Sequence, residues 1–204
     1  MQEVKNYNNY NNKSIMKTLN VRIEGICPLL QHDDKTANPF NSYTKRLKEI
    51  SGKRKKTEDD LLAMARIEWE ASLYYTKKDG YFIKAECFEA TLLAAAKSKK
   101  LGNIFKQAVS IPDNPIFHFK DEKKTPDQLF EMDEYKDFRT AKVGTSKIIR
   151  CRPVFENWYC DVCIWYEETR LDKSELLQVL EYAGRYIGVC DYRPKYGRFT
   201  SSVK

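Results

Sequence analysis

The chain has 204 residues, of which 42% are apolar and 32% charged, and its net charge is +7. This length and composition suit one compact globular domain and exclude collagen-like and wholly disordered proteins. No run of about 20 apolar residues occurs and the N-terminus lacks the apolar block of a signal peptide, so we expect a cytoplasmic protein with no membrane partner.

The first part of the chain combines a polar tail, a strand and a basic insertion. Residues 1–16 are rich in Asn and Tyr and are expected to be disordered, so the folded domain spans residues 17–204. Apolar residues alternate from Leu19 to Ile23, which predicts a half-buried strand. Residues 31–56 are expected to form an exposed basic insertion that contains a short helix.

Helices dominate the middle of the chain. Thr57 and Asp60 form a capping box that predicts the start of a helix. Its apolar residues share one face: Leu61, Ala65, Trp69 and Leu73. A second helix, rich in alanine, is predicted over residues 86–99. Residues 104–119 predict strands interrupted by two prolines, and residues 126–137 predict a short acidic helix.

The last third of the chain predicts a hairpin, a further strand, a helix and a returning strand. Residues 139–152 alternate weakly around a glycine and predict a basic hairpin, whereas residues 158–167 alternate strictly and predict a strand. Asp172 is expected to cap the last helix, and residues 192–203 return as a loop and final strand. This order predicts an α+β fold with a β-α-β-β-α-β core that carries insertions.

Charge is unevenly distributed along the chain. Residues 31–56, 139–152 and 185–204 carry net charges of +5, +5 and +4, whereas residues 121–138 carry −4. Basic segments that converge on one face of a fold form a surface suited to a polyanion.

Residues suited to catalysis or metal binding are few. Cys160 and Cys163 have the spacing of half a zinc site, but no second pair completes it, and thiols three apart on a strand face opposite sides. His118 falls in a predicted strand, which leaves His32 as the one candidate general base. Phosphate loops, nucleophile elbows and the H-E-x-x-H motif are absent. We therefore expect no catalytic residue, metal or cofactor, with a catalytic His32 as the alternative.

Two basic segments have the composition of a nucleic-acid interface. The hairpin places cations around a glycine, where they are expected to contact phosphates: Arg139, Lys142, Lys147, Arg150 and Arg152. In the C-terminal stretch 184–199, glycines would let backbone amides approach an anion, and four cations are expected to line the loop: Arg185, Arg193, Lys195 and Arg198. Tyr192 and Tyr196 are expected to stack on unpaired bases.

The C-terminal stretch resembles the glycine-rich loop of the RAMP superfamily, the ferredoxin-like RNA-binding proteins of CRISPR systems. The matching positions are Gly184, Gly188, Arg193, Gly197, Arg198 and Phe199. Residues 19–30 are similar to a first RAMP strand and its turn, and residues 81–93 to the strand that precedes the first long helix. The chain also resembles a family of uncharacterised phage proteins through motifs at residues 22–30, 150–158 and 183–199.

The resemblance implies a ferredoxin-like core of the RAMP or RRM type. It also implies non-catalytic binding of single-stranded RNA or DNA in the cytosol of a phage-infected bacterium. Copies of the chain are expected to assemble along the strand as a homo-oligomer or within a larger ribonucleoprotein. Two alternatives stay open. One is a metal-independent endoribonuclease that uses His32, and the other is a phage counter-defence protein that binds a nucleotide signal or a host partner.

Overall fold

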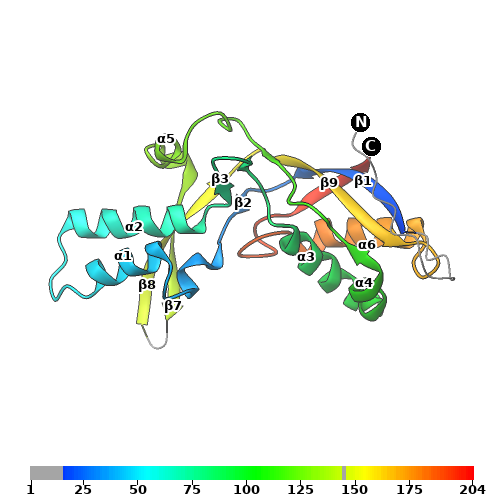
Figure 1. Ribbon diagram of the computed structural model, residues 1–204, viewed down its shortest axis with the longest axis horizontal. Helices are drawn as coiled ribbons and strands as arrows, with labels where there is room; N and C mark the ends of the chain where they lie inside the picture. Colours follow the sequence, from blue (N-terminus) through cyan, green and yellow to red (C-terminus); the bar gives the residue numbers. More distant parts are fainter. Residues whose placement is uncertain (1–15, 144–145) are drawn as a thin grey trace.

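The computed structural model describes residues 16–143 and 146–204. The protein is a mixed α+β structure with antiparallel sheets, as the order of predicted elements indicated. Figure 1 shows two groups of elements along the long axis, one built around a larger sheet and the other around a smaller sheet.

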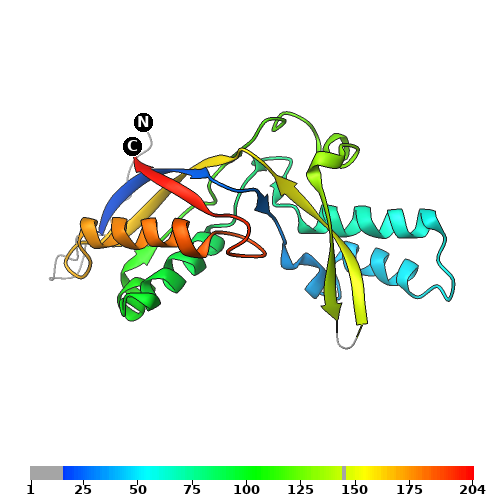
Figure 2. The same ribbon diagram turned by 180° about the vertical axis from the view of Figure 1, so that it is seen from behind.

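The larger sheet has the strand order β10-β1-β9-β5, and β6 also pairs with β9. Its strands are β1 (Met16–Gly25), β5 (Val109–Ser110), β6 (Phe117–His118), β9 (Tyr159–Glu167) and β10 (Phe199–Val203). Alternation along β9 buries every second residue from Cys160 to Tyr166. The buried face is covered by helices α3 (Ala85–Ser98), α4 (Gly102–Ala108) and α6 (Lys173–Tyr182), which lie on one side of the sheet in both Figure 1 and Figure 2.

The smaller sheet has the order β2-β8-β7 and contains the predicted basic hairpin. Its strands are β2 (Leu29–Leu30), β7 (Lys136–Val143) and β8 (Ser146–Phe155). Helices α1 (Ser42–Ser51) and α2 (Glu58–Ser72) lie beside β8 (Figure 1), and the capping box of Thr57 and Asp60 is present at the start of α2. Five short elements connect the longer helices and strands: η1 (Asp34–Ala37), β3 (Tyr75–Thr76), β4 (Gly80–Tyr81), α5 (Pro126–Phe130) and η2 (Asp133–Tyr135).

One hydrophobic cluster runs through both sheets. It contains Trp69 of α2 and Phe155 of β8 together with Val21 of β1 and Phe88 of α3, all of them buried. The indole nitrogen of Trp69 donates to the Tyr135 carbonyl at 2.7 Å, so the buried polar group of this large side chain is satisfied. The continuous core holds β8 in a fixed position relative to the larger sheet.

Three sequence predictions were wrong in detail. Residues 104–108 are part of helix α4, because Phe105 and Ala108 reach the core at helical spacing. Leu61 is 56% exposed, since the first turns of α2 extend beyond the core. Helix α5 ends at Phe130, and the chain has already entered β7 at Lys136. Of the predicted tail, residues 1–16, Met16 is already the first residue of β1, and residues 1–15 lie outside the described residues. In the part of the chain that the structure describes, no helix is long and apolar enough to cross a bilayer.

Candidate nucleic-acid interface

The three basic segments of the sequence meet around strand β8. Lys48 and Lys56, from the first segment, line a cleft with Arg150 and Arg152 of β8. The hairpin also contacts the loop over residues 188–198, which joins η3 (Ala183–Ile187) to β10. In Figure 2 the hairpin projects from the middle of the molecule, with this loop on one side and α1 and α2 on the other. Parts of all three basic segments therefore lie next to strand β8 or its partner β7.

Arg139 connects the hairpin to the C-terminal loop. Its guanidinium carbon lies 4.4 Å from the ring centre of Tyr192 and 4.5 Å from that of Tyr196, and Nη2 donates to the Tyr196 hydroxyl at 2.6 Å. Asp137, on the same face of β7, forms an ion pair with Arg139 and raises the pKa of its guanidinium. Only 19% of the Arg139 side chain is exposed. We call Arg139, Tyr192 and Tyr196 the clasp, because together they hold hairpin and loop in contact.

The two arginines of β8 also have carboxylate partners. Arg150 forms an ion pair with Glu68 of α2, and Arg152 forms one with Asp191 of the C-terminal loop. Burial lowers the pKa of Arg152, and repulsion from Arg150 and Arg139 lowers it further. Arg152 therefore lies close enough to Arg139 and Arg150 to be repelled by them, although each of the three has a carboxylate partner. These arginines are partly neutralised, so they fix the shape of the surface more than they offer free cations to phosphates.

The remaining cations of the C-terminal loop have different surroundings. Arg193 donates to the hydroxyl of Thr91, a buried residue of α3, at 3.0 Å. Lys195 and Arg198 are exposed, and neither forms an ion pair within residues 16–143 and 146–204. They are the predicted site residues best placed to contact phosphates.

Some predicted residues are not brought into this surface. Arg185 lies over the ring of Tyr186, at 5.4 Å from its centre, and lines a groove with Thr200 of β10. It therefore lies apart from the clasp. Lys142 and Lys147 face each other in the register of the hairpin, but their side chains lie outside the described parts of the protein.

The glycines of the C-terminal loop allow close backbone packing. An added Cβ would lie 2.7 Å from the Tyr196 carbonyl oxygen at Gly188 and 1.9 Å from the Val189 carbonyl oxygen at Gly197. The Gly188 amide already donates to the Ala183 carbonyl, and the Gly197 amide donates to the Pro28 carbonyl. These two amides are not available to an anion, so the hypothesis that these glycines expose amides to a phosphate is wrong.

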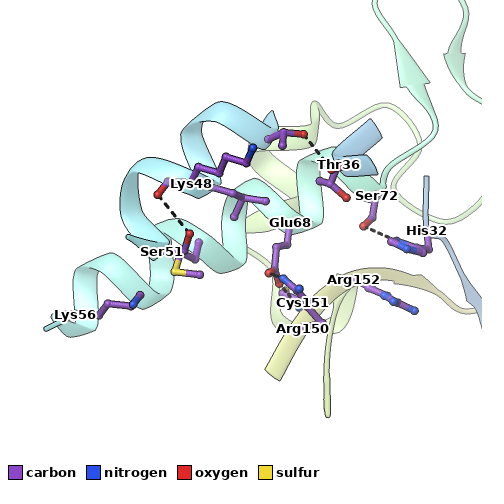
Figure 3. A pocket seen from close by; sticks show the side chains of 13 residues that line it. His32, Thr36, Lys48, Ser51, Lys56, Glu68, Ser72, Arg150, Cys151 and Arg152 are labelled. Atoms are coloured by element: carbon purple, nitrogen blue, oxygen red, sulfur yellow. Dashed lines mark hydrogen bonds and ion pairs between the residues drawn. The ribbon is translucent and has the colours of Figure 1, made fainter. Parts of the chain in front are cut away.

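A cleft of about 700 Å³ lies between α1, α2 and β8 (Figure 3). Figure 3 shows Lys56 at one end, Arg152 and His32 at the other, and Arg150 with Glu68 between them. This cleft was not predicted from the sequence. Glu68 lies on the same helical face as Ala65 and Ser72, and an acid on the inner face of a helix was the only local signal.

His32 lies in this cleft beside Ser72, with Nδ1 3.3 Å from the serine Oγ. Burial lowers the pKa of the imidazole, and the charges of Arg152 and Arg150 lower it further against the opposing effect of Asp33. These surroundings favour the neutral imidazole, which is the form that can accept a proton.

We expect the His32 ring to titrate below its ordinary value of 6.5. The folded-state pKa is then below that of the unfolded chain, so the unfolded state binds the extra proton. The contribution of His32 to the free energy of unfolding is therefore fully present above the unfolded-state pKa. It is lost as the pH falls from there through the lower folded-state pKa. Ring-proton NMR shifts against pH measure this, with His32→Gln used to assign the signal against His118. A midpoint at or above 6.5 would contradict the arrangement around His32.

The two cysteines that have the spacing of half a zinc site do not lie together. Cys160 is buried on β9, and Cys163 lies on the opposite face of the strand, as their spacing predicted. Across residues 16–143 and 146–204 no three His, Cys, Asp or Glu side chains come together in a metal-binding cluster.

Comparison with protein-family models gave no match, and comparison with curated proteins gave none. The function of the chain is therefore inferred from the geometry around β8.

Proposed function

We propose that the protein binds single-stranded nucleic acid across the surface around β8, without cleaving it. The observation that carries this proposal is the convergence of three separately basic segments, from α1, the β7–β8 hairpin and the C-terminal loop. Exposed cations on this surface are suited to phosphates, and the exposed ring of Tyr192 is suited to an unpaired base.

We further propose that the larger sheet with α3 and α6 is a ferredoxin-like core of RAMP type. The supporting observation is the path of the chain. α3 lies between β1 and β5, α6 lies between β9 and β10, and the strands have the order β10-β1-β9-β5. In chain order these elements follow one another as β-α-β-β-α-β, and in the sheet β9 lies between β1 and β5. The helices α1 and α2 and the hairpin are then insertions that carry most of the proposed interface.

The proposal is tested by measuring fluorescence anisotropy with labelled single strands of about 8, 16 and 32 nucleotides, in RNA and DNA form. We expect affinity to rise with length, because longer strands cover more of the surface, and to fall with salt, because phosphate binding releases counterions. Mass measurements of the complexes with the longest strand show whether several copies assemble on it. Absence of binding to every strand at low salt would refute the proposal.

The hairpin lysines provide a quantitative test. Replacing Lys142 and Lys147 together with alanine is expected to flatten the slope of log affinity against log salt by about 1.4, since each single-strand phosphate contact contributes about 0.7. Affinity should fall alike for all sequences, because phosphate contacts carry no base information. The control is Lys77→Ala with Lys78→Ala, which removes the same charge from the exposed turn before β4. A slope that changes equally in both double variants would place the hairpin outside the interface.

A second candidate function is RNA cleavage by His32. The observation that favours it is the position of His32 in a cleft that also holds Arg150 and Arg152, where burial lowers the pKa of the imidazole, because such a group can accept a proton beside a phosphate. Incubation with end-labelled RNA, with and without divalent metal, separates the two. We expect intact RNA, whereas a discrete product that disappears in His32→Ala would replace the binding proposal with a nuclease.

A further inference from the structure

The cleft between α1, α2 and β8 has the dimensions and lining of a small-ligand site. Its volume of about 700 Å³ falls within the range of about 300–1,000 Å³ that is typical of small-molecule pockets. Its lining includes the apolar side chains Leu47 and Met64 and the hydroxyls of Ser51 and Ser72. It can therefore accommodate an apolar ring and a polar group together.

The lining carries an excess of positive charge. Its cations are Lys48, Lys56, Arg150 and Arg152, and its single carboxylate is that of Glu68. Lys48 and Lys56 are exposed and form no ion pair among the described residues, and the only polar contact of the Lys56 amine is the Lys53 carbonyl at 3.1 Å. The two lysines thus remain free to neutralise an anion.

Part of the cleft is held in place before any ligand binds. Glu68 is 8% exposed. Its carboxylate accepts a hydrogen bond from the Arg150 guanidinium and another from the Cys151 amide, the latter at 3.2 Å. His32 is held beside Ser72 at the far end. Side chains fixed by such supporting contacts lose little freedom on binding, which favours affinity for a small ligand.

We propose that this cleft binds the phosphate monoester of a nucleotide, either free or at the end of a strand. A monoester carries about 1.5–2 negative charges at pH 7, whereas each backbone phosphate carries one, so the dianion suits the excess of cations better. The apolar side chains would contact the base or ribose. The inference rests on the proposed function for the identity of the ligand as a nucleotide.

The test compares two double variants of the full chain. Lys48→Gln with Lys56→Gln removes the unpaired cations of the cleft. Lys45→Gln with Lys55→Gln is the matched control, because it removes the same charge from exposed neighbours that do not line the cleft. The probes are AMP, adenosine, and 16-nucleotide strands, about the upper site size of a single-strand-binding domain, that end in a 5′-phosphate, a 3′-phosphate or hydroxyls only.

We expect AMP to bind and adenosine to bind at least about tenfold more weakly, the effect of one lost charge-assisted contact. A phosphate on one end should strengthen strand binding by a similar factor. Both gains should disappear in the cleft variant and persist in the control variant. The comparison of 5′- and 3′-phosphates shows which strand end is recognised.

The outcomes separate this inference from the proposed function. Equal binding of phosphorylated and hydroxyl-ended strands, with no AMP binding, would refute the cleft site and leave strand binding intact. Binding of AMP without binding of any strand would support the cleft site and refute the strand proposal. Adenosine that competes as well as AMP, or equal losses in both double variants, would refute the monoester site.

Discussion

Replacing Gly197 with alanine is expected to lower the free energy of unfolding by about 2–5 kcal/mol, combining the costs of a left-handed alanine and of overpacking. Gly197 has a φ of +71°, and an added Cβ would lie 1.9 Å from the Val189 carbonyl oxygen. The backbone cannot shift easily to relieve this contact. The Gly197 amide donates to the Pro28 carbonyl, and its own carbonyl accepts the Val189 amide, each at 2.9 Å. Urea denaturation followed by circular dichroism measures the loss.

Gly80 provides the matched control for this prediction. It has a nearly identical φ of +72°, but no atom lies within 4 Å of the position of an added Cβ. Gly80→Ala should therefore cost only about 1–2 kcal/mol, the price of the left-handed conformation alone. The difference between the two variants measures the close approach of backbone segments in the C-terminal loop. If both variants lost the same free energy of unfolding, the close approach of the Val189 carbonyl to Gly197 would not contribute to the effect of Gly197→Ala.

The elements that could be predicted from the sequence are those specified by local patterns. Strand β1 alternates from Leu19 to Ile23, β9 alternates over its whole length, and α2 begins at a capping box, so neighbouring residues alone define these elements. Helix α4 has seven residues, too few for helical spacing to stand out from alternation. Its helical state depends on where Phe105 meets the core.

The residues of the clasp could be identified from the sequence, whereas the cleft and the carboxylate partners of the arginines could not. The clasp joins residues that the sequence had already marked, because cations and tyrosines cluster locally in each segment. The acids that partly neutralise the arginines come from distant parts of the chain. Glu68 is 82 residues from Arg150 and Asp191 is 39 residues from Arg152. Only the fold brings these charges together. Because the arginines are paired, the cations without a carboxylate partner among the described residues include the exposed lysines Lys48 and Lys195.

Tyr192→Ala is expected to weaken binding of single-stranded oligonucleotides by about fivefold to 100-fold, since stacking of a base on an aromatic ring is worth about 1–3 kcal/mol. Tyr192 is 52% exposed, in spite of its contact with Arg139, and the exposed half of its surface is available to a base. Binding to duplexes should change much less, because paired and stacked bases do not present a free face. Fluorescence anisotropy with matched single and double strands measures both effects.

Three control variants separate stacking from structural support. Tyr192→Phe keeps the ring and should bind like the wild type. Tyr196→Phe removes only the hydroxyl that accepts from Arg139, so it should lower the melting temperature slightly while leaving stacking at Tyr192 intact. Trp165→Ala removes an aromatic side chain that is 45% exposed on β9 of the larger sheet, and it should not alter binding. If Trp165→Ala weakened binding as much as Tyr192→Ala, the loss would not be specific to the clasp, and the proposed stacking of a base on Tyr192 would be refuted.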